Sequence, residues 1–380
     1  MPNGNSSYLR WLVSNTKTSW WHDSADQAEL AKGLADGAVG VTTNPLLSYQ
    51  AIHAHPERWA ELLQTVPKGL TPQQRAEAIV TIVVRRTAEQ LLSIHAQTQG
   101  KQGYVCAQVN PALPGDRDAM LAMARRFHAI APNIAVKLPV TAAGLDVLEE
   151  CSAEGITTNG TVSFTVAQVI AVAERHRRGQ ARALKAGRQA CRSFATIMLG
   201  RLDDYLRDVA ADRRAPASES DVQQAGLAVV KRAYEIYQAM NYDTSLVIAA
   251  LRGVHHMVGL AGAEVIMSIH PSNQAKLTPA VSHQLGIETP LPNDVLDRLQ
   301  TIPDFIRAYE PDGLAQRDFI AYGASQRTLS QFLESGWRML ETYPLGLRTF
   351  EEIDLTNPIP TYIGGGLRAS DAARFCDVIN

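Results

Sequence analysis

Eight short apolar segments, each followed by a stretch with helical periodicity, limit the folds open to this chain. The segments that we predict to be strands are residues 19–23, 38–45, 103–109, 133–141, 155–159, 191–198, 245–251 and 264–269. They have the length of buried strands, and most are bounded by glycine, proline or asparagine. Helices between consecutive strands let the strands run parallel, because a parallel pair needs a long crossover connection. The pattern therefore predicts a parallel sheet covered by helices, among them helices at 46–63, 162–176 and 220–240.

Eight strand–helix units suggest a closed (β/α)8 barrel, the TIM-barrel architecture. An open, doubly wound sheet is the alternative, but no glycine-rich turn follows the first predicted strand, as in dinucleotide-binding folds of that type. We assign the barrel to residues 1–278. Further helices are expected at 293–309 and 329–343, so residues 279–380 are predicted to form a C-terminal helical extension packed on the barrel, not an independent domain. The glycines at 364–366 indicate a loop.

The amino-acid composition favours small molecules over nucleic acids or membranes as binding partners. The chain has 36 basic and 38 acidic residues, with 46% hydrophobic residues. This balance gives no electrostatic basis for binding nucleic acid or an anionic membrane, so small molecules are the expected partners. The cysteines are isolated from one another, which favours reduced thiols in the cytoplasm; they are Cys106, Cys151, Cys191 and Cys376. There is no apolar run of about 18 residues that could cross a bilayer. The basic stretch at 175–192 is expected to be a solvated surface.

One lysine interrupts the fourth predicted strand, residues 133–141. Side chains alternate along a strand, so Lys137 shares a face with Ala135 and lies opposite the bulkier Val136 and Leu138. Burial lowers the pKa of a lysine from about 10.4, and the neutral amine that results can attack a ketone to form a Schiff base. The alternative is a lysine at the strand end whose stem carries the ammonium group to water.

Polar residues gather where the predicted strands end, and a (β/α)8 barrel builds its active site at those carboxyl ends. These residues are Asp23, Asn44, Gln108, Asn110, Lys137, Thr141, Asn159, Thr161 and Thr196. A lysine, a carboxylate and several neutral amides and hydroxyls suit imine chemistry on a hydroxylated carbonyl compound. No His, Cys and Asp residues have metal-ligand spacing, so neither a metal nor another cofactor is predicted. Taken singly, each asparagine or threonine is better explained as a structural polar cap.

Five ordered motifs resemble those of the transaldolases and the related fructose 6-phosphate aldolases. Residues 40–45 (GVTTNP) resemble the signature after the second strand, and residues 136–145 (VKLPVTAAGL) resemble the segment that carries the Schiff-base lysine. Residues 155–168, 199–204 and 249–252 are similar to the segments at the ends of the fifth, sixth and seventh strands. The first two motifs together are specific, and the likeness covers most of the predicted barrel.

The resemblance implies a role for each matching residue. Lys137 would form an imine with C2 of a ketose, and Asp23 would move the proton of the C4 hydroxyl while the C3–C4 bond breaks or forms. Gln108 and Thr161 occupy positions that hold a catalytic water in the family. The implied substrate contacts are Asn44 and Asn159 for the dihydroxyacetone moiety, Thr196 in place of a serine, and Arg201 and Arg252 for phosphate. Without the resemblance, either arginine would fit a surface ion pair.

The chain departs from the patterns of the two branches near the ends of the third and sixth predicted strands. Most transaldolases have a glutamate where this chain has Gln108, and a glutamine there resembles the fructose 6-phosphate aldolase branch. That branch has a tyrosine near the end of the sixth strand, where this chain has Met198. The long C-terminal extension, in contrast, is closer to the longer transaldolases. The chemistry is therefore better supported than the substrate.

The resemblance implies a class I aldol transferase that moves a dihydroxyacetone unit from a ketose phosphate to an aldose phosphate, as in the pentose phosphate pathway. One alternative keeps the imine but releases free dihydroxyacetone, as a lyase does, and Gln108 is the feature that raises it. An alternative from another class is a barrel that binds sugar phosphates without turnover. The sequence leaves open the donor, the acceptor, whether the bound anion is phosphate, sulfonate or carboxylate, and whether the chain forms a homo-oligomer.

Overall fold

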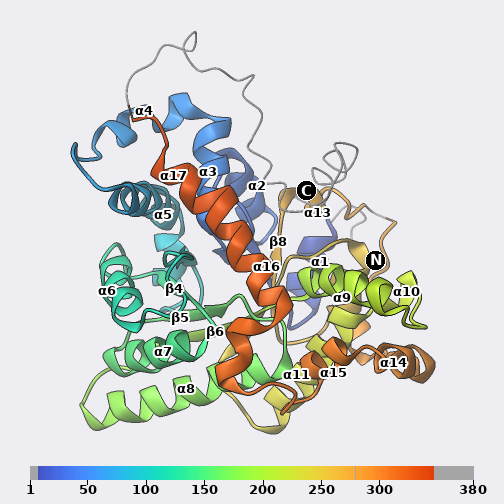
Figure 1. Cartoon of the computed structure of the whole chain (residues 1–380). Helices are drawn as coiled ribbons and strands as arrows, with labels where there is room; N and C mark the ends of the chain where they lie inside the picture. The colour runs from blue at the N-terminus through green and yellow to red at the C-terminus, as the bar shows by residue number, and fades with distance from the viewer. Residues whose placement is uncertain (1–6, 279, 346–380) are drawn as a thin grey trace.

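In the computed structural model, which describes residues 7–278 and 280–345, eight parallel strands form a closed barrel in sequence order (Figure 1). The strands are β1 (Ser19–His22), β2 (Gly40–Val41), β3 (Tyr104–Gln108), β4 (Ile134–Pro139), β5 (Thr158–Thr161), β6 (Ser193–Met198), β7 (Ser245–Ala249) and β8 (Ile266–Ile269). The last strand pairs with the first, which closes the barrel. The predicted (β/α)8 fold is confirmed.

Helices surround the barrel, and most begin where a side chain accepts a hydrogen bond from the first turn, as Asp26, Thr71 and Thr141 do. They are α1 (Tyr8–Asn15), α2 (Gln27–Ala35), α3 (Pro45–Ala54), α4 (Pro56–Gln64), α5 (Pro72–Gln97), α6 (Arg117–His128), α7 (Ala142–Glu154), α8 (Val166–Lys185), α9 (Leu199–Arg213), α10 (Glu219–Val222), α11 (Ala225–Ala239), α12 (Val254–Leu260) and α13 (Pro271–Gln274). Such caps satisfy amide groups that lack a partner within the helix.

The interior of the barrel holds an apolar layer under a polar one. The apolar layer consists of Trp21, Tyr104, Cys106, Ala135, Phe194 and Val247. Strand side chains repeat their direction every two residues, so the next inward residues toward the carboxyl ends of the strands are polar. They include Asp23, Gln108, Lys137 and Thr196. The alternation predicted for the lysine strand holds, since Ala135 packs inside while Val136 and Leu138 belong to the outer core.

Trp21 closes the barrel below the polar layer. Its ring meets that of Phe194 edge-on at 4.8 Å between centroids. A Cβ atom at Gly40 would lie 2.5 Å from Nε1 of Trp21, so the second strand needs a glycine at this level. The polar layer therefore faces away from a filled core and toward the carboxyl ends of the strands.

Several predicted boundaries are wrong for identifiable reasons. The helix expected at 46–63 is two helices, because Pro56 starts α4 and His55 before it has φ −138°. The fifth strand begins three residues later than expected, since Gly155 caps α7 with φ +83°. The helix expected from 162 begins at Val166. The helices expected at 220–240 and 293–309 are likewise each divided in two, α10 with α11 and α14 (Asn293–Leu299) with α15 (Pro303–Tyr309).

The described part of the extension packs on the barrel helices. It contains η1 (Gly286–Glu288), α14, α15, η2 (Gln316–Ala321), α16 (Gly323–Phe332), the π-helical turn η3 (Leu333–Trp337) and α17 (Arg338–Glu341). In Figure 1 the orange-red segment from α16 to α17 runs obliquely across the molecule toward α3 and α4. Tyr205 of α9 donates to the Asp304 carboxylate at 2.7 Å, and Tyr322 donates to the Asp304 carbonyl oxygen at 2.9 Å.

The division into a barrel at 1–278 and an extension at 279–380 stays a prediction, because residues 346–380 lie outside the described part of the chain. The glycines at 364–366 lie outside it as well.

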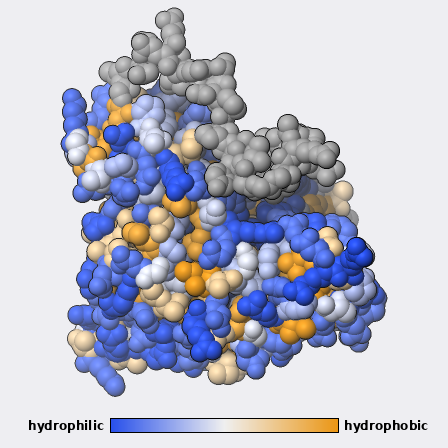
Figure 2. Space-filling view, viewed as in Figure 1, coloured by the Kyte–Doolittle hydropathy of each residue, from blue (hydrophilic) through white to orange (hydrophobic). Residues whose placement is uncertain are grey.

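The surface is mainly hydrophilic on the face that Figure 2 shows, with scattered apolar groups. The basic stretch at 175–192 pairs largely with acidic residues of α7: Arg175 contacts Asp146, and Arg182 donates to Glu150 at 2.8 Å. This part of the prediction, a solvated charged surface, is confirmed. Among the described residues, no helix is both long and apolar enough to cross a membrane.

Candidate active site

Lys137 lies on the inner face of β4, and only 5% of its surface is exposed. Burial lowers the pKa of its ammonium group, an effect that Cys106 and Asp23 oppose and Arg201 reinforces. Its Nζ atom donates to the carbonyl oxygen of Thr43 at 3.3 Å. The side chain does not reach bulk water, and its neutral, nucleophilic form is favoured relative to that of an exposed lysine.

The strand register brings two amides beside the lysine. Lys137 pairs with Gln108 on β3 and with Asn159 on β5. Three neighbouring strands therefore present these side chains at the same level of the barrel. Thr161 is two residues beyond Asn159 on the same face and lies one layer closer to the carboxyl ends. This row is the centre of the candidate active site.

Asp23 follows β1 and is held by a hydroxyl chain. The Asp23 Oδ1 atom accepts a hydrogen bond from Thr42 Oγ1 at 2.5 Å, and Thr42 Oγ1 lies 2.5 Å from Ser268 Oγ. An ionised carboxylate can only accept, so Thr42 donates to Asp23 and Ser268 donates to Thr42. Within the described residues Asp23 Oδ2 has no hydrogen bond, which leaves it available to a substrate proton.

The Asn159 amide has a fixed orientation. Thr196 Oγ1 donates to Asn159 Oδ1 at 2.7 Å, and Asn159 Nδ2 donates to the sulfur of Cys106 at 3.3 Å. Burial raises the pKa of the Cys106 thiol, with smaller opposing effects from Lys137 and Asn159, so this sulfur is a protonated thiol at neutral pH. The second hydrogen of Nδ2 is thereby left for a ligand.

Two polar atoms in the site are buried and lack a partner among the described residues. They are Gln108 Oε1 and Thr161 Oγ1. Buried polar groups are nearly always hydrogen-bonded to protein, water or ligand, so each marks a place where a small polar molecule can bind. The Gln108 oxygen accepts and the Thr161 hydroxyl can donate or accept, so each can bind a water.

Three other polar residues predicted to lie at the strand ends make hydrogen bonds to nearby backbone. Asn44 Oδ1 accepts from the Leu47 backbone at 2.9 Å and so caps α3. Asn110 Oδ1 accepts from the Ala112 backbone at 2.9 Å. Thr141 caps α7 and donates to the Pro114 carbonyl oxygen at 2.6 Å. Asn44 keeps its amide nitrogen free of hydrogen bonds to residues 7–278 and 280–345, so a ligand contact there is compatible with the cap.

The two arginines lie on neighbouring elements but in different surroundings. Arg252, in the loop between β7 and α12, binds Asp204 Oδ2 through Nε at 3.0 Å and Nη2 at 2.6 Å. Arg201, near the start of α9, binds Gln331 through Nη1. Burial lowers the pKa of Arg201 to about 10, and the charge of Arg252 adds to this lowering. The guanidinium is still protonated at neutral pH, and the pair provides excess positive charge.

A buried pair positions the backbone of Arg252. The Nε2 atom of His256 lies 3.0 Å from Asp203 Oδ2, and Nδ1 of His256 accepts from the Arg252 backbone N–H at 3.1 Å. Asp203 Oδ1 accepts from Gly226 at 2.7 Å. Thus Asp204 holds the side chain of Arg252 while the adjacent Asp203, through His256, holds its backbone.

Strained backbone flanks the polar layer. Val162 follows β5 with φ +55°, and Ala250 follows β7 with φ +59°. The left-handed region is costly for residues other than glycine, most of all for a β-branched valine. Val162 adjoins Thr161, and Ala250 is two residues before Arg252. The surrounding structure therefore maintains two strained backbone conformations next to residues of the site.

Sequence reasoning missed Thr42, Ser268 and Gln331 as parts of the site. Ser268 had a signal, since it is the polar residue near the end of an apolar strand. Thr42 lies in the GVTTNP motif but was given no role. Gln331 had no signal, because it lies 130 residues from Arg201 and outside every motif.

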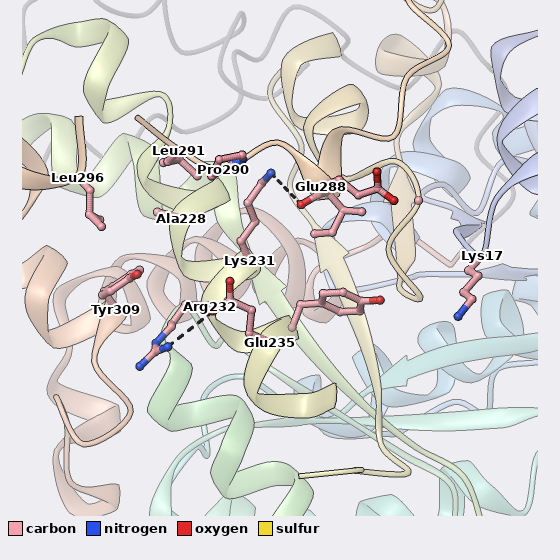
Figure 3. Close-up of a pocket in the computed structure, with 13 residues that line it drawn as sticks. Lys17, Ala228, Lys231, Arg232, Glu235, Glu288, Pro290, Leu291, Leu296 and Tyr309 are labelled. Carbon is pink, nitrogen blue, oxygen red and sulfur yellow. Dashed lines mark hydrogen bonds and ion pairs between the residues drawn. The ribbon is translucent and has the colours of Figure 1, made fainter. Parts of the chain in front are cut away.

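A separate pocket of about 600 Å³ lies against the outer face of α11, away from the polar layer (Figure 3). Lys231 projects from α11 and donates to three backbone carbonyl oxygens, including that of Gly286 at 2.7 Å. Arg232 pairs with Glu235 at 3.6 Å. None of the residues that line this pocket belongs to the polar layer, so the pocket is no part of the candidate active site.

Comparisons with known proteins agree with this geometry. The family model described as "Transaldolase/Fructose-6-phosphate aldolase" matches residues 20–331. A protein named Transaldolase from Neisseria gonorrhoeae is 28% identical over 324 residues, covering 84% of each chain. One of the same name from Thiobacillus denitrificans is 26% identical over 345 residues, which is 87% of this chain and 96% of that protein. A third, from Mycolicibacterium paratuberculosis, is 31% identical over 242 residues, or 60% of this chain and 63% of its own.

The chain therefore belongs to the transaldolase/fructose-6-phosphate aldolase family, as its motifs predicted. The predicted class, an enzyme of the transaldolase type, is confirmed with it. In the described residues, no group of three or more His, Cys, Asp and Glu side chains could hold a metal ion.

Proposed function

We propose that this protein transfers a dihydroxyacetone unit from a ketose phosphate to an aldose phosphate through a Schiff base on Lys137. The observation that carries the proposal is a buried lysine paired in register with Gln108 and Asn159. Burial lowers the lysine pKa and so favours the neutral amine that imine formation requires. The side chains around it are suited to binding a hydroxylated ketone.

Imine formation needs a proton carrier. The neutral Nζ of Lys137 attacks C2 of the ketose, and the carbinolamine loses its hydroxyl as water to give an iminium ion. A water held between Thr161 and Gln108 can relay protons in both steps, because both residues have an unpartnered polar atom among the described residues. Asn159 would donate its remaining amide hydrogen to a hydroxyl of the donor.

Carbon–carbon cleavage follows at Asp23. Its free carboxylate oxygen takes the proton of the C4 hydroxyl, the C3–C4 bond breaks, and its electron pair moves into the iminium to form an enamine. An aldose leaves with a carbonyl at its first carbon. The enamine carbon then attacks the carbonyl carbon of an acceptor aldose, and Asp23 returns the proton to the new hydroxyl. Hydrolysis of the iminium releases the new ketose. The Thr42 hydrogen bond at 2.5 Å keeps the carboxylate in position throughout.

The phosphate end of the substrate would bind at Arg201 and Arg252. The two guanidinium groups lie close enough for the charge of one to lower the pKa of the other. A bound dianion would offset this repulsion, and the binding energy would help to orient the reacting carbon against Lys137. This is a substrate role. Arg252 also connects the loop after β7 to Asp204 of α9, and Arg201 connects α9 to Gln331 of α16.

A second candidate function is release of free dihydroxyacetone without transfer. Gln108 supports it, because an amide holds a water but cannot take its proton near neutral pH, whereas a carboxylate does both. A non-catalytic sugar-phosphate-binding barrel is the third candidate. The presence of Lys137, Asp23 and Asn159 together argues against a non-catalytic role. We further propose action in the pentose phosphate pathway and a cytoplasmic location, as the family resemblance implies.

The direct test is product analysis. The protein is incubated with fructose 6-phosphate, with and without erythrose 4-phosphate, and the products are identified by mass spectrometry. A seven-carbon ketose phosphate formed only with the acceptor supports transfer. Free dihydroxyacetone formed equally in both samples supports the lyase function. No product in either sample, with binding retained, supports the non-catalytic barrel.

A further inference from the structure

The C-terminal extension reaches the candidate active site through one helical segment. Helix α16 continues through η3 into α17, so residues 323–341 form an almost uninterrupted rod (Figure 1). Its first part packs on α9, which carries Arg201, and its later part packs on α3, which follows Asn44. A single segment of the extension therefore contacts the elements behind two groups proposed to bind substrate.

At the α9 end, α16 holds the Arg201 side chain. The side-chain oxygen of Gln331 accepts a hydrogen bond from Arg201 Nη1. The next residue, Phe332, is buried and places its ring 5.3 Å from the Arg201 guanidinium carbon. This is a cation–π distance. The guanidinium is thus fixed in position by an amide and an aromatic ring.

Both of these contacts are neutral, which distinguishes Arg201 from its neighbour. Within the described residues, no carboxylate lies within 4.0 Å of the Arg201 guanidinium, whereas Arg252 makes a two-nitrogen ion pair with Asp204. Arg207 also contacts Asp204, at 3.0 Å, but has Glu219 as a second partner at 2.9 Å. The charge of Arg252 is therefore largely compensated, and that of Arg201 is the more available to an incoming anion.

At the other end, the rod is fixed against the start of α3. A Cβ atom at Gly336, in the π-helical turn, would lie 2.5 Å from the Leu46 backbone nitrogen and 2.8 Å from the Pro45 carbonyl carbon. Only a glycine permits this approach without a shift of backbone. Gln331 lies five positions before Gly336, so this contact limits how far α16 can move relative to Arg201.

We propose that Gln331 is a positioning and specificity residue for the anionic group of the substrate, and that α16 thereby makes the extension a part of the substrate site. The inference rests on the proposed function. The amide oxygen orients Arg201 without neutralising it. The amide nitrogen has no hydrogen bond within the described residues, so it can donate to an anion oxygen. A carboxylate in this place would cancel the charge that the anion needs.

The experiment compares Gln331→Leu and Gln331→Glu with the wild type on fructose 6-phosphate and on fructose. Gln331→Leu removes the acceptor, and we expect KM for the phosphorylated ketose to rise about tenfold. Gln331→Glu keeps an acceptor but adds a charge, and we expect a rise of about a hundredfold. For both variants, kcat/KM on fructose should change by less than about threefold.

Gln326→Glu is the matched control, because Gln326 lies on the same helix and is exposed, with its amide bound to the Ile320 carbonyl oxygen. It introduces the same charge away from Arg201, so its phosphate preference should equal that of the wild type. Thermal unfolding of each variant separates loss of structure from loss of recognition.

A structural role for Gln331 predicts a different pattern. A Glu–Arg pair would then serve at least as well as the native contact, and Gln331→Glu would keep the wild-type preference for the phosphorylated ketose. That result, or equal losses on the two ketoses, would overturn the inference. Failure of the proposed function is distinguishable, since the wild type itself would then form no borohydride-trapped adduct with either ketose.

Discussion

The Nζ atom of Lys137 lies 3.3 Å from the carbonyl oxygen of Thr43, the residue directly before Asn44. The barrel thereby connects the amine on the fourth strand to the motif that starts α3. The acceptor is neutral, so the ammonium form gains a hydrogen bond without a full ion pair. Burial therefore remains the largest influence on the lysine pKa.

The first prediction concerns pH and stability. Burial places the pKa of Lys137 below its usual 10.5 in the folded protein, whereas the unfolded chain binds the proton near 10.5. Between the two pKa values the unfolded state binds more protons, so the contribution of this group to stability rises with pH. Lys137→Met removes that contribution.

The measurement is urea unfolding of both proteins from about pH 6 to about pH 10. The variant should exceed the wild type in stability at the lower end of this range, and the difference should shrink as pH rises. A difference that does not change with pH would show that the lysine titrates alike in both states.

The second prediction separates proton transfer from imine formation. Asp23→Asn keeps the shape of the side chain but cannot accept the C4 proton, so kcat for ketose cleavage should fall about a hundredfold or more. Thr42→Val removes the donor to Asp23 and should lower kcat about tenfold. Steady-state kinetics measures both losses.

Two controls accompany these variants. Thr42→Ser retains the hydroxyl and should restore most of the activity lost in Thr42→Val. Borohydride trapping of dihydroxyacetone on Lys137 should persist in every variant, because that step needs no C3–C4 cleavage. If trapping disappears together with turnover, Asp23 acts on the amine rather than on the C4 hydroxyl.

The third prediction concerns Gln108. Gln108→Glu adds a group that can take up a proton from the water beside Thr161, so it should raise transfer to an aldose acceptor relative to release of dihydroxyacetone. The ratio of the two products is the measurement, and Gln108→Met serves as a control without a polar group. An unchanged ratio in Gln108→Glu would show that residue 108 does not determine the balance of transfer and release. Met198 or the extension would then be the next candidate.

The fourth prediction tests how tightly the extension packs. Gly336→Ala should destabilise the protein by about 1 to 3 kcal/mol, because the added methyl group must displace backbone at Pro45 or Leu46. Gly115→Ala is the matched control, since a Cβ atom there meets nothing within 4 Å and its backbone is not left-handed. Chemical unfolding compares the two. Equal stabilities would mean that the π-helical turn moves away from α3 at no cost.

The sequence allowed the barrel and most of its polar layer to be predicted because both depend on local patterns. Apolar runs alternating with helices specify a parallel barrel, and period-two alternation directs Lys137 inward beside Ala135. The ends of helices and strands were harder to predict. Pro56 divides a predicted helix and Gly155 delays the start of the fifth strand, although both residues are visible in the sequence. The left-handed conformations of Val162 and Ala250 have no sequence signature, since neither residue type favours them.

Contacts between distant segments could not be predicted in this way. The hydroxyl chain from Ser268 through Thr42 to Asp23 spans most of the barrel sequence, and it forms because β8 closes onto β1. The contact of Gln331 with Arg201 depends on how the extension crosses the barrel. A single sequence shows neither this crossing nor which half-buried charges pair, such as Arg252 with Asp204.

Borohydride trapping is the decisive test of whether Lys137 forms a Schiff base with the ketose. The protein is incubated with fructose 6-phosphate, reduced with borohydride, digested and analysed by mass spectrometry, with Lys137→Met as the control. We expect a three-carbon or six-carbon adduct on the peptide that contains Lys137 and on no other lysine. An adduct on another lysine, or none on the wild type under conditions in which it turns over the ketose, would contradict it.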